Sequence, residues 1–365
     1  MAIIYLSPHL SVDSTGATQV AKNNLKMLQT LFGCEVMPYA VNRNPILEAT
    51  PLDVTRSTAG TAFANLQGLC ATLSAKGRKQ FLDDIKSKSP RLIWLDSSLF
   101  GRLISEIRLI APSAKIVSYF HNSEIDLVKH RLLNGALHYI PAWMATYSNE
   151  LNSAKRADAV ATITKCDGMR INRLYGRNNA YTLPVSLSLK EGIHSRWMNS
   201  NEVLFVGSDF LPNIEGLRFL NNKVAPLLSK KRILVAGRGL ARHLEGKVND
   251  RIELIGFVED LSDLYMKSRA TLAPIFSGGG MKVKIAESLM HNRPVIATPF
   301  AAIGYEDSGS DSIHKVDSAE KFANAIEEWE PEFKDSAVTD FRNLYSFDAN
   351  LKCVIGMLKD IGVKV

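Results

Sequence analysis

The residues with the clearest chemical potential are a lysine and a glutamate that follow a run of glycines. Gly278, Gly279 and Gly280 precede a predicted helix that carries Lys284 and Glu287. Glycines let a backbone turn tightly and approach a ligand, and a helix N-terminus offers unpaired N–H groups to an anion. Lys284 could therefore reach a bound phosphate, and Glu287 could accept hydrogen bonds from ribose hydroxyls. The alternative is a solvated Lys–Glu pair on an amphipathic helix, which contributes little to stability.

The segments on either side of the glycines predict how these side chains are held. The apolar run Ala270–Phe276 predicts a buried strand, and Val295–Thr298 predicts another after the stop signal Asn292-Arg293-Pro294. The helix between them carries one polar stripe: Lys284, Glu287, Ser288 and His291. A parallel crossover of this kind places the glycine loop at the carboxyl edge of a sheet, where open α/β folds bind ligands.

The sequence from Gly278 to Glu306, GGGMKVKIAESLMHNRPVIATPFAAIGYE, resembles the nucleotide-sugar-binding signature of retaining GT-B glycosyltransferases of family four. The resemblance implies an α/β fold of the GT-B type, with two Rossmann-like doubly wound domains facing a central cleft. It also implies that Glu287 holds the donor ribose, and that Gly278, Gly279, Gly280 and Met281 meet the diphosphate and the sugar.

Upstream segments extend the resemblance over residues 200–305. VLFVGSDFLPNIEGLRFL, which contains Gly207, resembles the opening of the family's donor domain, and Gly237-Arg238-Gly239 follows another predicted strand. RIELIGF ends at Phe257, in the loop that often flanks the nucleotide base in this family.

Two departures from the family pattern bear on the phosphate site. Many members place an arginine and a lysine after the first donor-domain strand, where this chain has Ser208 and Pro212-Asn213. Many also carry a glutamate at the position of Gly279, so the identity of the transferred sugar stays open. Lys282 and Lys284 are therefore the predicted catalytic cations that neutralise the diphosphate, with Arg238 as a weaker third.

The pattern of the N-terminal half predicts alternating strands and helices, which is typical of a doubly wound sheet. The apolar strand Ile116–Phe120 ends at His121, and a histidine in that place is often structural. The resemblance implies instead a catalytic contact between His121 and the donor sugar. Gly16 matches one glycine of the family's first loop, and Thr164 matches a hydroxyl position after the strand Ala159–Ile163.

The length of 365 residues predicts more than one domain. We expect an acceptor-binding domain over residues 1–190, a nucleotide-sugar-binding domain over 200–345, and a C-terminal helix over 346–365 that crosses back to the first domain. Four scattered cysteines show no metal-ligand spacing, and we expect neither a metal nor another cofactor. No signal peptide and no transmembrane run is recognisable, which predicts a protein that is cytoplasmic or peripheral on the inner face of a membrane.

The net charge of +7 lies in the first half of the chain. Residues 1–185 hold 21 Lys and Arg against 13 Asp and Glu, and the remainder holds 23 against 24. This asymmetry indicates an anionic partner, and without a nucleic-acid-binding motif we expect an anionic membrane surface or a lipid pyrophosphate. The segment Lys129–Asn152, with basic residues followed by aromatics, could face that membrane, although a partly buried helix is the simpler alternative.

The function predicted from the sequence is transfer of a sugar from a nucleotide-diphosphate sugar to an acceptor hydroxyl. By resemblance, the anomeric configuration is retained, and the acceptor is lipid-linked or a surface glycan, as in polysaccharide or lipopolysaccharide biosynthesis. Two alternatives remain open. One is a degenerate homologue that only binds nucleotide sugar or a partner protein, and the other is a nucleotide-sugar epimerase.

Overall fold

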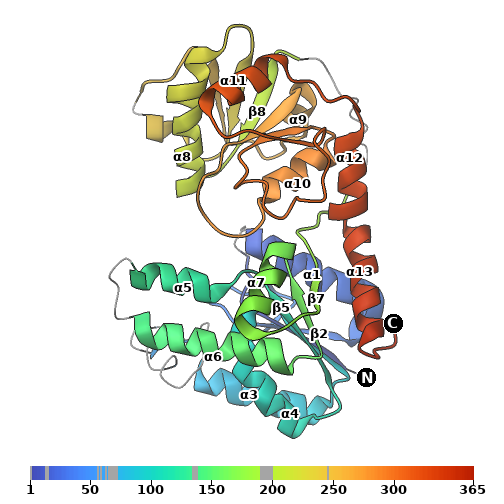
Figure 1. The fold of residues 1–365 in the computed structure, drawn as a ribbon. Coiled ribbons are helices and arrows are strands. Elements are labelled where there is room, and N and C mark those ends of the chain that lie inside the picture. Colours follow the sequence, from blue (N-terminus) through green and yellow to red (C-terminus); the bar gives the residue numbers. More distant parts are fainter. Residues whose placement is uncertain are drawn as a thin grey trace. The chain divides into compact units, whose positions relative to one another are not determined.

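The structure, a computed structural model, describes residues 2–12, 16–55, 57, 60–61, 64, 73–133, 139–189, 200–244 and 246–365. It divides into two compact units (Figure 1). The N-terminal unit comprises Met1–Pro184 together with Leu351–Val365, and the C-terminal unit comprises Val185–Asn350. The last stretch of chain therefore belongs to the first unit, and the hydrogen bond from the Tyr181 hydroxyl to the Asp360 carboxylate, 2.8 Å long, attaches it there.

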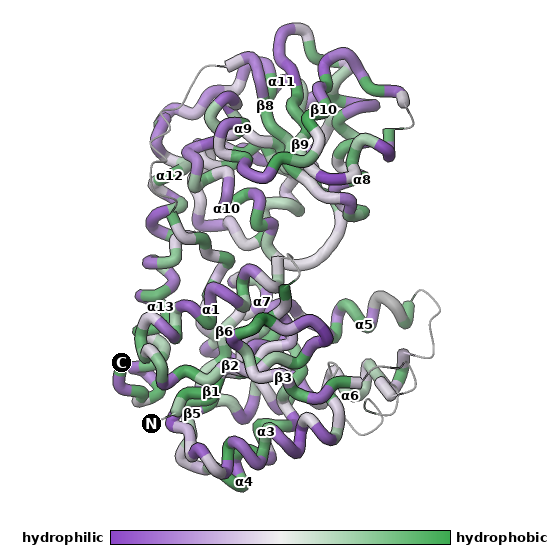
Figure 2. Tube along the Cα trace, turned by 180° about the vertical axis from the view of Figure 1, so that it is seen from behind, coloured by the Kyte–Doolittle hydropathy of each residue, from purple (hydrophilic) through white to green (hydrophobic). Residues whose placement is uncertain are grey.

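The N-terminal unit is built on a parallel sheet with the strand order β3-β2-β1-β4-β5-β6-β7. Its strands are β1 (Ile3–Ser7), β2 (Val36–Ala40), β3 (Thr50–Pro51), β4 (Leu92–Leu95), β5 (Lys115–Phe120), β6 (Ala159–Thr162) and β7 (Ala180–Thr182). The central strands are nearly continuous apolar runs because both faces of a parallel sheet are covered (Figure 2). Leu6 pairs with Leu95 and Leu95 with Ser118, so the residues that follow β1, β4 and β5 reach one edge of the sheet.

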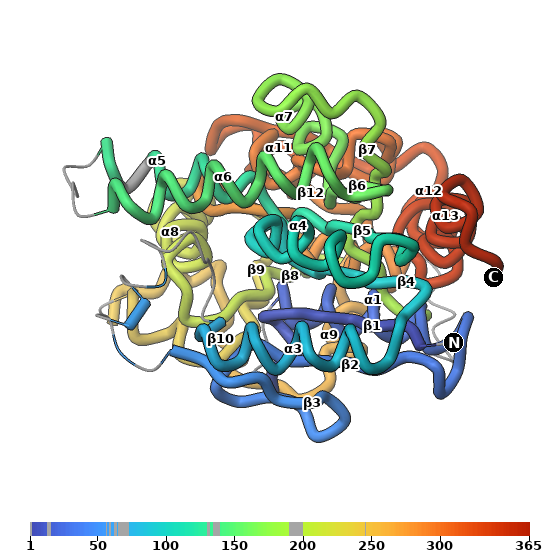
Figure 3. Tube along the Cα trace, turned by 90° about the horizontal axis from the view of Figure 1, so that it is seen from below, coloured from blue at the N-terminus to red at the C-terminus, as the bar shows by residue number. Residues whose placement is uncertain are grey.

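The helices of this unit are α1 (Gly16–Phe32), α3 (Ala75–Lys88), α4 (Gly101–Ile110), α5 (Glu124–Leu133), α6 (Ile140–Arg156), α7 (Lys165–Tyr175) and the greater part of α13 (Phe347–Asp360). α4 and α6 lie side by side (Figure 3). Gly101 permits this close approach, since a Cβ there would lie 1.8 Å from the carbonyl oxygen of Asn149 on α6. Any larger residue at Gly101 would force the two helices apart.

The C-terminal unit has a second parallel sheet, with the order β10-β9-β8-β11-β12-β13. Its strands are β8 (Glu202–Val206), β9 (Arg232–Ala236), β10 (Ile252–Gly256), β11 (Ala270–Ala273), β12 (Val295–Ala297) and β13 (Ile313–Lys315). Its helices are α8 (Leu211–Phe219), α9 (Ser262–Lys267), α10 (Val283–Met290), α11 (Ala319–Glu328) and α12 (Ser336–Asp340). The prediction of an α/β fold with two doubly wound domains is confirmed.

The predicted strand–loop–helix–strand unit is present as β11, the glycine loop, α10 and β12. One detail of its prediction was wrong: the first strand ends at Ala273 rather than Phe276, and the chain continues to the glycines as a loop. In the predicted polar stripe of α10, Ser288 and His291 are buried. Buried polar groups need hydrogen bonds, and the Ser288 hydroxyl donates one to the carbonyl of Arg293, 2.7 Å away.

The helix expected over Lys129–Asn152 is two helices, α5 and α6, and residues 134–138 between them lie outside the described part. Pro141, at the start of α6, accounts for a new helix beginning there, because proline fits the first turn but not a helix interior. Residues 191–199, between the two expected domains, likewise lie outside the described part, which resumes at Ser200. Among the described helices, none is long and apolar enough to cross a membrane.

Candidate nucleotide-sugar site

The glycine loop needs glycine at two of its three glycine positions. Gly278 has φ of 101° and Gly280 has φ of 64°, values in the left-handed region that other residues rarely adopt. The ammonium of Lys282 donates to the carbonyl oxygens of Gly279, at 3.0 Å, and Gly280, at 2.7 Å. Lys282 therefore folds back over the loop and holds its shape. In this structure it is bound to the loop rather than extended away from it.

The start of α10 is clamped by the hydroxyl of Tyr305. It donates to the carbonyl of Lys282 at 2.9 Å and accepts from the N–H of Ala286 at 3.2 Å. Tyr305 is fully buried, and Met281, in the loop just before Lys282, is buried too. These contacts fix the first turn of α10 immediately after the glycines, where its N–H groups and the helix dipole favour an anion.

Lys284 is held from the opposite side by α8. Its ammonium donates to Oδ1 of Asn213 at 2.7 Å and lies 4.8 Å from the centroid of the Phe205 ring. Burial lowers the pKa of Lys284 to about 7, against the opposing charge of Glu287. Burial also lowers the pKa of Lys282 to about 8. The alternative of a solvated Lys–Glu pair is wrong, since the lysine is desolvated and bonded to an asparagine instead.

Glu287 lies half-buried on α10, next to the hydroxyl of Tyr265. That hydroxyl is 3.5 Å from Oε2, a long hydrogen bond, and burial together with Glu287 raises the pKa of Tyr265 well above its usual value. The Tyr265 ring also stacks on His291, with 4.4 Å between ring centroids. The carboxylate of Glu287 is therefore contacted by a tyrosine whose ring is held in place by stacking on His291.

A second group of predicted residues follows β8, β9 and β10. Gly237 has φ of 145°, and a Cβ there would lie 1.5 Å from the carbonyl oxygen of Gly207. These two glycines thus allow adjacent loops to touch. The guanidinium of Arg238 lies 4.4 Å from the centroid of the exposed Phe257 ring, which forms a flat cation–π platform. A platform of this kind offers a stacking surface to a planar ligand.

The strand order brings these predicted residues together. β10, β9, β8 and β11 are neighbours in one parallel sheet, so the loops that follow them share its carboxyl edge. Those loops contain eight of the predicted donor-site residues, and the adjoining α10 adds two more: Gly207, Arg238, Phe257, Gly278, Gly279, Gly280, Met281, Lys282, Lys284 and Glu287. Gly16 and His121 are in the other unit, where Gly16 is the exposed first residue of α1.

Sequence reasoning missed the polar partners around this edge. Asn213 was read only as a departure from the family pattern, yet it binds Lys284. Asp209, after β8, forms an ion pair with Arg242 and lies 2.6 Å from Nε2 of His243. The available signal was that Ser208 and Asp209 come just after a buried strand, with Asn213 a few residues further on. Their partners follow another strand, which the sequence does not specify.

His121 in the N-terminal unit belongs to a buried polar network. Its Nε2 lies 3.1 Å from Oδ2 of Asp96, and the same carboxylate accepts from Ser7, at 2.8 Å, and from Asn24, at 3.0 Å. Burial opposes ionisation of Asp96, but His121 and the hydrogen bond from Asn24 outweigh it and lower the pKa of that carboxyl. Asp96 was not predicted, although it follows a buried strand just as His121 does.

The ring of His121 is packed between two aromatic neighbours. Its centroid lies 4.7 Å from that of His9 and 4.8 Å from that of Tyr119. Thr164, matched to a family hydroxyl position, instead caps α7, because its side chain accepts from the N–H of Asp167 at 2.9 Å. That position is therefore explained by the local fold.

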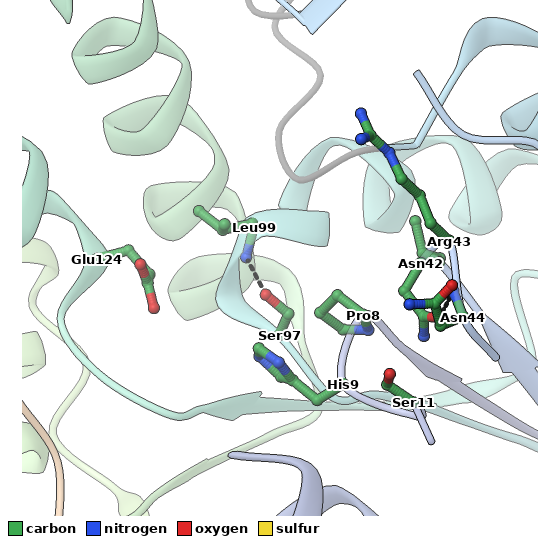
Figure 4. Close-up of a pocket in the computed structure, with 10 residues that line it drawn as sticks. Pro8, His9, Ser11, Asn42, Arg43, Asn44, Ser97, Leu99 and Glu124 are labelled. Atoms are coloured by element: carbon green, nitrogen blue, oxygen red, sulfur yellow. Dashed lines mark hydrogen bonds between the residues drawn. The ribbon is translucent and has the colours of Figure 1, made fainter. Parts of the chain in front are cut away.

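A cavity of about 500 Å³ opens beside this network within the N-terminal unit. Figure 4 shows Glu124 on one side of it and Asn42, Arg43 and Asn44 on the other, with His9 between them. Among the described residues, no cluster of His, Cys, Asp and Glu could hold a metal ion, and the expectation of a metal-free site remains a prediction.

A comparison with protein families matches residues 200–329 to the family described as glycosyl transferases group 1. This segment is a group 1 glycosyl transferase domain. It contains the glycine loop, both lysines and Glu287 of the site described above. A search of curated proteins by sequence found no match.

Solved structures resemble the group 1 domain together with the rest of the chain. HepE of Anabaena in complex with UDP has 11% identity, a TM-score of 0.71, and coverage of 99% of this chain and 100% of that chain. The apo form of the lipopolysaccharide outer core galactosyltransferase WaaB has 12% identity, a TM-score of 0.70, and 99% coverage of both chains. A glycosyltransferase from Rickettsia africae has 13% identity, a TM-score of 0.65, and coverage of 99% and 98%. The matched structures are GT-B glycosyltransferases, and the chain shares their fold.

Proposed function

We propose that this protein transfers a sugar from a nucleotide-diphosphate sugar to the hydroxyl of an acceptor. One observation carries the proposal. Inside the group 1 domain, the glycine loop, Lys282, Lys284 and Glu287 share one sheet edge with the Arg238–Phe257 platform. This edge offers helix N–H groups and two cations for a diphosphate, a carboxylate for ribose hydroxyls, and an aromatic platform for a base.

The lysines suit a reaction in which negative charge grows on a leaving diphosphate. Both have lowered pKa values because they are desolvated, so pairing with a phosphate would stabilise their charged forms. Charge that develops only as the glycosidic bond breaks is the charge that such groups stabilise most usefully. Retention, carried over from the family resemblance, then corresponds to attack on the same face, with the departing phosphate accepting the acceptor's proton.

The donor nucleotide to test first is uridine diphosphate. HepE was solved with UDP, with UDP and glucose, and with UDP-glucose, and its fold covers 99% of this chain. The acceptor in this proposal is a glycan, free or carried on a lipid.

We also propose that the N-terminal unit docks reversibly on an anionic membrane. α5 and α6 lie side by side and expose apolar side chains: Leu127, Leu133, Ile140, Trp143, Met144 and Tyr147. Lys129, on α5, is exposed beside them, and the first half of the chain carries the whole basic excess. Apolar side chains flanked by basic charge match the chemistry of an acidic lipid surface.

The transferase proposal is tested by measuring nucleoside diphosphate release from UDP-, GDP- and dTDP-sugars, with simple glycosides or lipid-linked glycans as acceptors. Release that depends on the acceptor and yields a longer glycan is the expected result. Tight nucleotide-sugar binding without release would support a non-catalytic binding protein instead. Recovery of an isomerised nucleotide sugar without transfer would identify an epimerase.

A further inference from the structure

A second carboxylate, Glu150 on α6, is fully buried in the N-terminal unit. Its oxygens accept hydrogen bonds from the hydroxyl of Tyr175 on α7, at 2.7 Å, and from the hydroxyl of Ser98, at 3.2 Å. They also accept from the backbone N–H groups of Glu124, at 2.9 Å, and Ile125, at 3.3 Å, at the start of α5. Since α6 packs against both α5 and α7 (Figure 1), this one side chain joins three parts of the unit.

Two of those parts continue directly from the residues of the buried Asp96–His121 pair. Ser98 lies two residues after Asp96, and α5 begins three residues after His121. Asp96 and His121 follow neighbouring strands, β4 and β5, and their side chains lie 3.1 Å apart. Connections of two or three residues transmit any shift of the segments they join. Glu150 therefore holds both sides of the pair from α6.

The charge on Glu150 opposes its burial. Burial raises the pKa of Glu150 to about 7, helped by the carboxylate of Glu124 and opposed by the hydrogen bonds from Tyr175 and α5. Arg170 on α7 also faces it, but that guanidinium pairs with Asp126 on α5 at 2.6 Å, and the turn after β4 presents an uncharged hydroxyl. The ionised carboxylate accepts from all four donors, whereas a proton on one oxygen turns an acceptor into a donor.

We propose that Glu150 is a positioning residue for sugar transfer, which in its ionised form holds the start of α5 against the turn after β4 and thereby keeps His121 in place. The inference rests on the proposed function and on the catalytic contact predicted for His121. Glu150 acts through the backbone of α5 and touches no substrate in this role. A neutral amide would be cheaper to bury, but its nitrogen cannot accept from an N–H group of α5.

Stability and activity should respond to the proton on Glu150 in opposite directions. Its folded-state pKa lies above the usual 4.5, so proton binding stabilises the fold; this contribution is complete below about pH 4.5 and is lost as the pH rises through about 7. Transfer requires the ionised form, so kcat at saturating donor and acceptor should fall as the pH drops below about 7. A carboxylate with a merely structural role would not separate these two trends.

Glu150→Gln is the variant that keeps the shape and removes the charge. It should fold, and its stability relative to the unchanged protein should rise between about pH 5 and about pH 8, because no charge is buried. Its kcat at about pH 8 should be about tenfold lower, and the decline below pH 7 should disappear. Denaturant unfolding and the pH profile of kcat measure both effects. An unchanged kcat at about pH 8 would overturn the inference.

Tyr175→Phe tests the same group without altering its charge. The hydroxyl of Tyr175 lowers the pKa of Glu150, so its removal should move the decline of kcat to higher pH. The matched control is Tyr39→Phe, which removes a hydrogen bond to the carboxylate of Asp84 elsewhere in the same unit. That control should keep the profile of the unchanged protein. A profile for Tyr175→Phe that coincides with the control would contradict the role of Glu150.

Amide hydrogen exchange separates this inference from the proposed function, since it needs neither donor nor acceptor. In Glu150→Gln at about pH 8, the N–H of Glu124 or of Ile125 should exchange faster than in the unchanged protein, and that of Val117 in β5 should not. If this change occurs but no transfer is detected with any donor, the transferase proposal fails and the hold of Glu150 on α5 stands. Equal exchange at both α5 positions would refute the inference, even in an active enzyme.

Discussion

The ammonium of Lys284 and the side-chain oxygen of Asn213 form a 2.7 Å hydrogen bond, although 71 residues separate them in the sequence. The asparagine supplies a neutral dipole where a carboxylate would fully stabilise the ammonium. The lysine therefore stays close to losing its proton, with a pKa of about 7. An incoming diphosphate would provide the missing negative charge.

The first prediction follows from that state of Lys284. An anionic donor binds the protonated amine, so affinity for UDP-glucose should be level below pH 7 and fall as the pH rises above it. The decline can reach about tenfold per pH unit for one linked proton, and Lys282, with a pKa of about 8, extends it upward. Calorimetry in buffers of different ionisation enthalpy should show proton uptake. Lys284→Met should remove the onset near pH 7, and a flat profile in the unchanged protein would contradict the linkage.

The second prediction concerns Glu287. Replacement by Gln removes a charged acceptor for the ribose hydroxyls, which should weaken donor binding by about 1.5–3 kcal/mol. Folding should persist, because glutamine keeps the size of the side chain and an oxygen that can accept the long hydrogen bond from Tyr265. Calorimetric titration with the donor nucleotide measures the loss. Glu253→Gln, at an exposed strand position in the same unit, is the control and should bind normally. Equal affinities for all three proteins would remove Glu287 from the site.

The third prediction compares two glycines with positive φ. Gly237→Ala should prevent stable folding of the C-terminal unit, because its Cβ would overlap the carbonyl oxygen of Gly207. Gly256→Ala meets no atom within 4 Å, so only its φ of 80° opposes it, at a cost of about 1–2 kcal/mol. Denaturant unfolding of both variants measures the difference. Similar losses of stability would show that contact with Gly207 does not decide the outcome.

The fourth prediction concerns docking on acidic lipid. Vesicles containing anionic lipid should sediment the protein at low salt, and neutral vesicles or high salt should not. Lys129→Glu combined with Met144→Ser removes charge and apolar area from α5 and α6, and should weaken binding at least several-fold. Leu109→Ser, at an exposed apolar residue on α4, is the matched control and should bind normally. Recovery on neutral vesicles equal to that on anionic ones would argue against a membrane site.

The sequence by itself determined the local chemistry of the donor site. Glycines before a short amphipathic helix predict an anion-binding turn, because their backbone freedom and the helix N-terminus are local properties. The placing of Lys284 and Glu287 on that helix is local as well, and so is the alternation of apolar strands with helices that predicts two doubly wound sheets. The predicted strand end at Phe276 failed because apolar composition alone does not show where pairing stops, and β11 pairs only through Ala273.

Only the tertiary structure decided which partners these residues have. Parallel strands deliver their carboxyl ends to one edge, so Ser7, Asp96 and His121 meet although up to 114 positions of sequence separate them. The same geometry brings Asn213 to Lys284 and His9 to His121. Desolvation, which lowers the pKa values of Lys284 and His9, depends on what the whole unit packs around each group. The type of a residue thus determines which protonation states and hydrogen bonds its side chain can have. The packing at the sheet edge determines its pKa and therefore its charge at a given pH.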